Sequence, residues 1–265
     1  MKWGLRGNCN LVAIGAVNYV VATAVSAAVA VVQQSEPLSP GSWVAALIGG
    51  TSYVISYFFY SRCIRLAGVS VSTTVVRLSV LPAVLASVLI WHERPGLVQA
   101  AGIVLVMVAM PLLSSQRSPG PGVVADGRTW VWLLPLFLTT AGGSVAMRLF
   151  QEVGSAGSRP LLLVVWFAVA SLIAVAALRR QRLWATRDDW RLGALLGTIN
   201  VVGNTALLIS LQYLPGAIVF PASSGGGVML AVLSARLLWG ETLSRPALAG
   251  VAIAVPALVL MNLPG

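Results

Sequence analysis

The stretch Leu11–Val32, which is LVAIGAVNYVVATAVSAAVAVV, contains no charged residue and decides the fold class. A helix rises ~1.5 Å per residue, so about 20 such residues cross the hydrocarbon core of a bilayer. Comparable apolar stretches occur nine times, at approximately residues 11–32, 43–60, 71–90, 97–113, 130–150, 160–178, 192–211, 217–238 and 247–262. None shows the ~10-residue alternation of a barrel strand. The sequence therefore predicts an all-α, multi-pass bundle of nine transmembrane helices.

The composition of the chain excludes a soluble protein. Of its 265 residues, 58% are hydrophobic and only 9% are charged, whereas roughly 25% are charged in a soluble domain. The net charge of +10 is not concentrated in a long basic tract, so we expect no nucleic-acid partner. The two cysteines match neither a disulfide framework nor a metal site. We therefore expect no metal, no cofactor and no catalytic residue.

The distribution of basic residues predicts the orientation in the membrane. Thirteen Arg and Lys residues fall in connections on the side of the N-terminus, and three fall on the other side. By the positive-inside rule the N-terminus is cytoplasmic, and nine spans then place the C-terminus outside. The expected location is the plasma membrane, that is, the inner membrane of the cell.

The sequence repeats itself with an offset of 148 residues. The segment Trp91-His92-Glu93 recurs as Trp239-Gly240-Glu241. The same offset pairs Gly49 with Gly197, Gly68 with Gly216, and Gly102 with Gly250. We call two residues separated by this offset repeat mates. Matches of Val and Ala between apolar helices are common by chance, but tryptophan, glutamate and glycine pairs in one register are not.

The offset matches spans one to four with spans six to nine, a shift of five spans. Because five is odd, matched helices cross the membrane in opposite directions, and such inverted repeats are typical of secondary transporters. We expect a first repeat of four helices at 1–113, a linker at 114–128 and a second repeat of five helices at 129–265. The fifth span has no mate.

The motifs around the repeat resemble the EamA type of the drug/metabolite transporter superfamily. The resemblance is carried by Ala217–Val232 followed by Leu237–Glu241 and Gly250, by Ser79–Pro82 through Glu93 to Gly102, and by Asn18–Ala22. It implies a bundle of five plus five helices, whereas this chain shows four plus five and lacks the first helix. We expect either an in-frame apolar segment of about twenty residues encoded upstream of Met1, or a protein that is natively short.

Arg77 is the only charged residue inside a predicted span. A charge in the membrane is costly and marks a functional site by default, so Arg77 is a candidate ligand for a carboxylate or phosphate group of the substrate. Arg77 lies six residues after Val71, which is ~9 Å along a helix. Its long side chain could instead reach the cytoplasmic headgroups, and the sequence leaves both interpretations open.

Further candidates are polar or helix-breaking residues within or beside the spans. Polar residues that bind substrate or form interhelical hydrogen bonds are Asn18, Tyr53, Tyr57, Asn200, Asn204, Ser223 and Ser224. Candidate hinge or close-packing residues are Pro82, Pro221, Gly225, Gly226 and Gly227. The mates Glu93 and Glu241 sit where spans four and nine begin. There a carboxylate stabilises a helix N-terminus, and proton coupling is the alternative role.

These observations predict a secondary transporter that moves a small metabolite or drug-like solute, in the direction of export, by alternating access between inverted repeats. The alternatives are an integral membrane enzyme and a non-transporting membrane scaffold. The expected partners are a small-molecule substrate and the lipid bilayer, and the sequence leaves a homodimer open.

Overall fold

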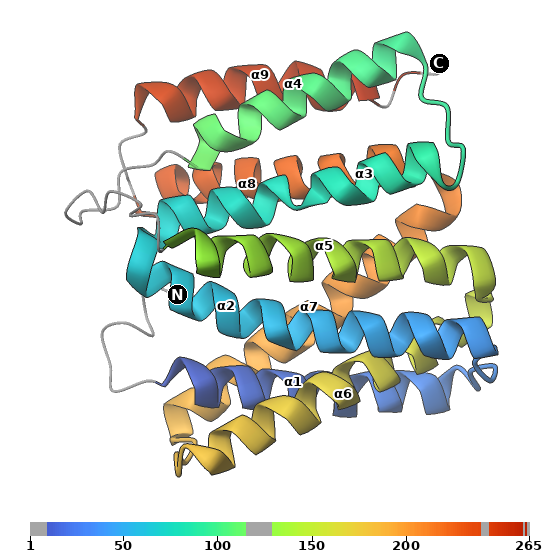
Figure 1. Ribbon diagram of the computed structural model, residues 1–265, viewed down its shortest axis with the longest axis vertical. Coiled ribbons are helices and arrows are strands. Elements are labelled where there is room, and N and C mark those ends of the chain that lie inside the picture. The colour runs from blue at the N-terminus through green and yellow to red at the C-terminus, as the bar shows by residue number, and fades with distance from the viewer. Residues whose placement is uncertain (1–9, 115–128, 240–243, 262, 264–265) are drawn as a thin grey trace. The chain divides into compact units, whose positions relative to one another are not determined.

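All regular secondary structure in the described part of the chain is helical. A computed structural model describes residues 10–114, 129–239, 244–261 and 263. The elements are α1 (Leu11–Val32), α2 (Pro40–Leu78), α3 (Val80–Leu89), α4 (Leu97–Ser114), α5 (Trp130–Val153), the 3₁₀ helix η2 (Ala156–Ser158), α6 (Arg159–Arg180), α7 (Arg187–Tyr213), α8 (Gly216–Trp239) and α9 (Arg245–Met261) (Figure 1). The all-α fold class is therefore confirmed. The predicted linker, except Ser114, lies outside the described residues.

Seven helical segments of the described chain are long and apolar enough to cross a membrane. They are Leu11–Val32, Pro40–Val69, Val71–Leu89, Trp130–Val153, Ala156–Arg180, Arg187–Tyr213 and Gly216–Ser234. The apolar helices Leu97–Leu113 and Arg245–Met261 are shorter. At 17 residues each they reach only about 25 Å, close to the lower limit for a span. The chain is a multi-pass membrane protein.

A sharp turn divides α2 at Gly68, where the second predicted span ends and the third begins. Gly68 has φ 82° and ψ 165°, a conformation that residues with a β-carbon rarely adopt. The third predicted span, 71–90, corresponds to the apolar segment Val71–Leu89, which is interrupted at one residue: α2 ends at Leu78 and α3 begins at Val80. Pro82 has no N–H group to donate to the carbonyl of Leu78, which explains the break.

The glycine-rich segment of α8 contains no such break. The sequence left open a broken helix around Pro221, but α8 is continuous from Gly216 to Trp239. A β-carbon built on Gly225 would lie 2.7 Å from Cγ1 of Val106 in α4. The absence of a side chain at Gly225 therefore lets α8 approach α4 closely.

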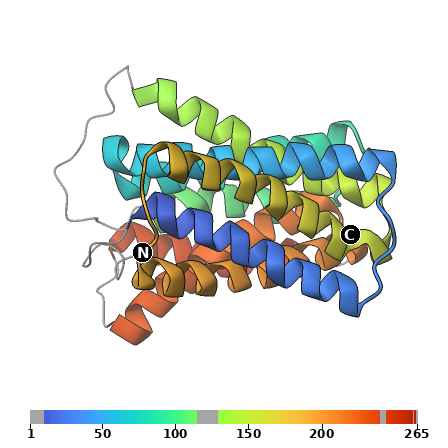
Figure 2. The same ribbon diagram turned by 90° about the horizontal axis from the view of Figure 1, so that it is seen from below.

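The chain divides into two compact units, and each contains helices of both predicted repeats. Unit 1 comprises Met1–Phe58 and Ala146–Gln212, and unit 2 comprises Phe59–Val145 and Tyr213–Gly265. In unit 1, α1 packs against α6 (Figure 2). In unit 2, α4 packs against α9 and α3 packs against α8 (Figure 1). All three pairs consist of helices that the 148-residue offset matches.

The contact between α4 and α9 is reciprocal. A β-carbon built on Gly102 would lie 2.7 Å from Cγ of Met261, and one built on Gly250 would lie 2.9 Å from Cγ of Leu113. Gly250 is the repeat mate of Gly102, and Met261 is the mate of Leu113. In the first contact α4 supplies the glycine and α9 the larger side chain, and in the second contact α9 supplies the glycine and α4 the larger side chain. The two contacts are therefore equivalent, as in a two-fold symmetric interface. The start of each helix packs on the end of the other, so the two helices are antiparallel.

Unit 1 contains a second reciprocal contact. Gly49 of α2 packs against the ring of Trp166 in α6, and Gly197 of α7 packs against the backbone carbonyl of Asn18 in α1. Gly197 is the mate of Gly49, and Trp166 is the mate of Asn18. Both units thus have the internal two-fold relation that an inverted repeat predicts.

Substitution of a mated glycine tests this packing. A β-carbon on Gly102 would lie 2.8 Å from the backbone carbonyl oxygen of Ala257, whereas one on Gly203 would meet nothing within 4 Å. We expect Gly102→Ala to lower stability by about 1–3 kcal/mol through overpacking. We expect Gly203→Ala in α7 to be neutral or to stabilise the helix by up to about 1 kcal/mol. Thermal unfolding in detergent measures both, and equal melting temperatures for the two variants would contradict the packing.

Candidate functional site

Five of the eight predicted substrate-binding residues come together in unit 1. They belong to α1, α2 and α7, and we call them the amide–tyrosine cluster: Asn18, Tyr53, Tyr57, Asn200 and Asn204. The other three, Arg77, Ser223 and Ser224, belong to unit 2.

Asn200 is the centre of the amide–tyrosine cluster. Its Nδ2 donates to Oδ1 of Asn18 over 2.8 Å, and its Oδ1 accepts from the hydroxyl of Tyr53 over 3.1 Å. Its backbone carbonyl accepts from Nδ2 of Asn204 over 2.7 Å. Asn18 is buried, at 5% exposure. The side chain of Asn200 therefore links α1, α2 and α7 through partly buried hydrogen bonds.

Aromatic side chains surround the cluster, and the sequence did not single out three of them. Tyr19 is buried and lies edge-on to Tyr53 and Tyr57, with ring centroids 5.8 and 6.0 Å apart. Tyr53 makes similar contacts with Trp166 and Phe167, at 6.3 and 6.0 Å. Tyr19 follows Asn18 directly, and Trp166 is the repeat mate of Asn18; both relations were visible in the sequence. Each edge-to-face contact stabilises this part of unit 1 by about 0.5–1.5 kcal/mol beyond the burial of the rings.

Tyr57 fills the space between the first half of α1 and α2. Its hydroxyl donates to the carbonyl of Leu11 over 2.6 Å. Its ring lies against Gly15, where a β-carbon would come within 2.5 Å of Cε1 of Tyr57. The glycine is needed because the tyrosine ring occupies the room that any side chain at this position would take.

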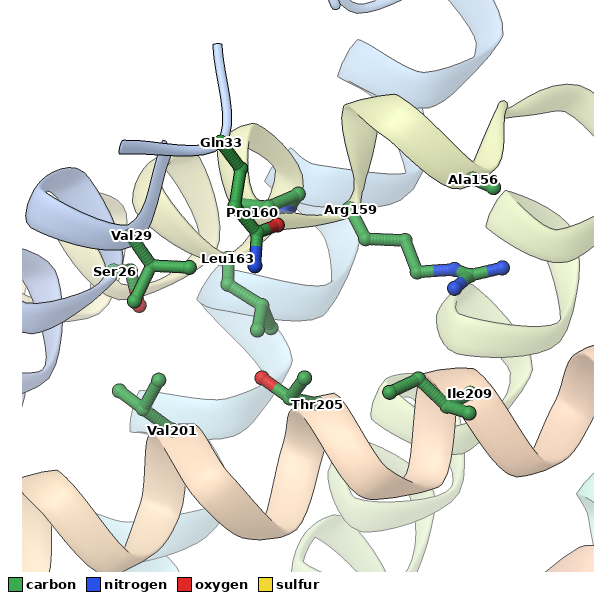
Figure 3. A pocket seen from close by; sticks show the side chains of 10 residues that line it. All are labelled: Ser26, Val29, Gln33, Ala156, Arg159, Pro160, Leu163, Val201, Thr205 and Ile209. Carbon is green, nitrogen blue, oxygen red and sulfur yellow. The ribbon is translucent and has the colours of Figure 1, made fainter. Parts of the chain in front are cut away.

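Unit 1 also contains a pocket between α1, α6 and α7. It encloses about 100 Å³ and is lined by Ser26, Val29, Gln33, Ala156, Arg159, Pro160, Leu163, Val201, Thr205 and Ile209 (Figure 3). The hydroxyl of Ser26 is buried and has no hydrogen-bond partner among the described residues. None of the lining residues was among the predicted site residues, since none stands out in the sequence as a charge inside a span.

In unit 2, Arg77 lies in the second part of α2 and faces α8. A β-carbon built on Gly227 would lie 3.9 Å from Nη1 of Arg77. Nε of Arg77 is buried and has no hydrogen-bond partner among the described residues. Ser223 precedes Gly227 by four residues, so the two lie on one face of α8. Ser224 is half-buried on the same helix.

The carboxylate of Glu93 caps a helix other than the one that follows it in the sequence. We expected it at the start of the fourth span, but its two oxygens accept from the backbone N–H groups of Gly216 and Ala217, over 3.0 and 2.8 Å. Glu93 therefore stabilises the N-terminus of α8, where unpaired N–H groups and the helix dipole favour negative charge. Glu241 lies outside the described residues.

Asp189 is a buried carboxylate near the start of α7. It lies in the first turn of α7 and is 0% exposed. One carboxylate oxygen accepts from the backbone N–H and hydroxyl of Thr186, and the other from the backbone N–H of Asn10. Thr186 and Asp189 have the spacing of a capping box, a signal the sequence offered. The described residues contain no group of three or more His, Cys, Asp or Glu that could hold a metal ion.

Substitution of Glu93 separates a capping role from proton coupling. We expect Glu93→Ala to lower the unfolding free energy by about 1–2 kcal/mol, because two N–H groups of α8 lose their acceptor. Glu93→Gln keeps an acceptor, so we expect a smaller loss of stability and retained transport. Asp188→Ala is the control, because Asp188 is an exposed carboxylate whose ion-pair partner, Arg191, is exposed as well. Normal stability with abolished transport in Glu93→Gln would contradict the capping role.

Comparisons with known proteins show what the chain is similar to. The model of the EamA-like transporter family matches residues 1–115. An uncharacterized protein of Haemophilus influenzae (strain ATCC 51907 / DSM 11121 / KW20 / Rd) is 24% identical over 205 residues, which is 76% of this chain and 69% of the relative. A protein of known crystal structure shares the fold, with a TM-score of 0.72 and 20% identity over 97% of this chain and 88% of the other. The family model thus matches the first 115 of the 265 residues, which is consistent with the resemblance of the sequence to the EamA type of the drug/metabolite transporter superfamily.

Proposed function

We propose that the protein is a secondary transporter that exports a small metabolite or drug-like solute across the plasma membrane by alternating access. The reciprocal packing of repeat mates carries this proposal. In an inverted repeat, the two halves of the chain cross the membrane in opposite directions and pack with a two-fold relation. If the two halves exchange their conformations, an outward-open state becomes an inward-open state. The contacts Gly102–Met261 and Gly250–Leu113 are such a relation within one helix pair.

Arg77 supports a substrate that carries a negative charge. A guanidinium group in an apolar bundle is costly unless it meets an anion or several hydrogen-bond acceptors. Its Nε lacks such a partner in the described chain. The mate of Arg77 is Gly225, so the charge breaks the symmetry of the repeat. A carboxylate or phosphate group on the solute would supply the missing acceptor in the same plane as the guanidinium.

The alternative functions have less support. A membrane enzyme needs a nucleophile, base or metal, and the amide–tyrosine cluster contains only amide and phenol groups. A scaffold needs neither inverted repeats nor a charged side chain facing the inside of a helix pair. An assay that recovers the solute chemically unchanged on the other side of a vesicle membrane distinguishes transport from catalysis.

We propose the orientation with a cytoplasmic N-terminus. The excess of Arg and Lys on that side supports it. In this orientation α1 begins on the cytoplasmic side, and the pocket near Gln33 and Arg159 lies toward the outside.

Replacement of Arg77 tests the proposed role of the charge. In liposomes that contain purified protein, we expect Arg77→Ala to reduce uptake of anionic or zwitterionic solutes by at least about tenfold, the loss of ~1.4 kcal/mol of binding. Arg77→Lys should retain part of the uptake, because it keeps the charge but loses the planar fork. The matched control is Arg65→Ala, which removes an exposed arginine of α2 and should not change uptake.

The solute panel for this experiment comprises amino acids, organic acids and drug-like cations. Size-exclusion chromatography establishes that each variant is folded. If the wild-type protein moved no member of the panel, the proposed transport would be wrong. If Arg77→Ala transported as well as Arg65→Ala, Arg77 would be an interfacial anchor rather than a substrate ligand.

A further inference from the structure

Four exposed arginines lie at the junction between α6 and α7. We call them the arginine patch: Arg179, Arg180, Arg182 and Arg187. Within the described ranges none of the four has an ion-pair partner. The carboxylate of Asp188 pairs with Arg191 over 3.8 Å, and the neighbouring Asp189 is buried. The arginine patch therefore carries four positive charges on the surface of unit 1.

The backbone that carries the arginine patch is ordered by hydrogen bonds at both of its ends. At the end of α6, Arg182 has φ 53°, and its N–H donates to the carbonyl of Arg179 over 3.0 Å. The N–H of Leu183 donates to the carbonyl of Leu178 over 3.2 Å, which completes a Schellman turn. At the start of α7 the carboxylate of Asp189 accepts three hydrogen bonds. The four arginines are therefore presented by a hydrogen-bonded backbone.

The same turn ends α1, where it carries no arginine. Gln34 is the repeat mate of Arg182 and has φ 48°, and its N–H donates to the carbonyl of Val31 over 3.2 Å. The N–H of Ser35 donates to the carbonyl of Ala30 over 3.0 Å. The mates of the first three arginines of the patch are uncharged: Val31, Val32 and Gln34. Because the turn forms at α1 without arginine, its geometry does not explain the cluster of charges at α6.

Two exposed tryptophans accompany the arginine patch. Trp184 is 89% exposed and Trp190 is 50% exposed. Their repeat mates, Glu36 and Ser42, are not aromatic, so the tryptophans also break the repeat. An indole ring combines a large apolar surface with one N–H donor, and tryptophan is enriched where a membrane meets water. The two tryptophans therefore indicate that the arginine patch lies at the depth of the lipid headgroups. A signal for orientation alone would need positive charge, but neither aromatic neighbours nor an ordered backbone.

We propose that the arginine patch binds the phosphate groups of anionic phospholipids. An arginine side chain can donate two parallel hydrogen bonds to one phosphate group. Clusters of about four to eight basic residues next to a transmembrane helix are typical of anionic-lipid binding. The lipid site goes beyond the proposed transport and does not depend on it, because lipid binding can be measured without any solute.

The experiment uses a fluorescent reporter beside the arginine patch. Ala185→Cys is made in a Cys9→Ser, Cys63→Ala background, labelled with a fluorophore and reconstituted as the full chain in phosphatidylcholine vesicles. Nitroxide-labelled phosphatidylglycerol and nitroxide-labelled phosphatidylcholine are then compared as quenchers. We expect the local association constant of phosphatidylglycerol to be at least about fivefold higher. Raising the salt concentration from about 0.1 M to about 1 M should reduce this preference, because salt screens the charges.

Two matched double variants test which arginines bind the lipid. Arg179→Gln with Arg182→Gln removes half of the charge of the patch, and the turn should still form because glutamine occupies the mate of Arg182. We expect the preference for phosphatidylglycerol to fall at least about threefold. The control is Arg62→Gln with Arg65→Gln, which removes two exposed arginines of α2 on the same predicted side of the membrane. It should leave the preference unchanged.

Every outcome bears on the lipid site. Equal quenching by the two lipids in the unsubstituted patch overturns it. An equal loss of preference in the two double variants also overturns it, because positive charge anywhere on that side would then account for the preference. If Arg179→Gln with Arg182→Gln does not fold, Arg180→Gln with Arg187→Gln takes its place. A nitroxide near the headgroup should quench the reporter more than a nitroxide at the end of the acyl chain, and the reverse order would contradict the interfacial position.

Discussion

Close approach of helix backbones at mated glycines is the constraint on which the rest of this structure depends. Inside a bilayer the lipid chains are as apolar as leucine, so helices associate through tight packing and hydrogen bonds rather than through the hydrophobic effect. Gly102 and Gly250 bring α4 and α9 together, and Gly49 and Gly197 do the same in unit 1. When two glycines are mates, the residues that they contact are also mates. Gly102 and Gly250 contact Met261 and Leu113, and Gly49 and Gly197 contact Trp166 and Asn18. This exchange is what an inverted repeat requires of its packing.

Because the two repeats are related in sequence and packing, the few positions at which repeat mates differ are informative. The structural needs of two mated positions are similar, so a large difference between them points to a local role. Arg182 differs from Gln34, and the last turn of α6 is basic while that of α1 is not. Arg77 differs from Gly225, and one position has a half-buried cation while the other is a close helix contact. The residues to which we assign functional roles therefore lie at positions where the two repeats differ.

The sequence predicted the helices and the mates but not the contacts between them. Apolar length locates a span because the bilayer thickness fixes it, and α1 has the predicted bounds, Leu11–Val32. Pro82 was a candidate hinge or close-packing residue, and the structure has the helix interruption three residues before it, at Ser79. Glu93 was assigned to the wrong helix, since its partners Gly216 and Ala217 are more than 120 residues away in the sequence. The pocket could not be predicted, because ordinary residues of three helices form it.

The amide–tyrosine cluster shows the same limit at single residues. Asn18, Asn200 and Tyr53 were singled out as polar residues in apolar spans, and the structure joins them in one hydrogen-bonded chain. Tyr19, Trp166 and Phe167 were not singled out, because an aromatic residue in an apolar span is ordinary. Only their position around Asn18 and Tyr53 distinguishes them.

Disulfide cross-linking between α4 and the chain end after α9 tests the antiparallel packing of repeat mates most directly. Nε2 of Gln99 donates to the carbonyl of Leu263 over 3.1 Å, so a short bifunctional methanethiosulfonate reagent should join Gln99→Cys to Leu263→Cys in membranes. The mate of Gln99 is Ala247, 16 residues before Leu263 and about 24 Å away along a helix. The pair Gln99→Cys and Ala247→Cys should therefore not cross-link. Peptide mass spectrometry in a background without native cysteines would show the first link alone, and finding the second link instead would contradict the inverted repeat.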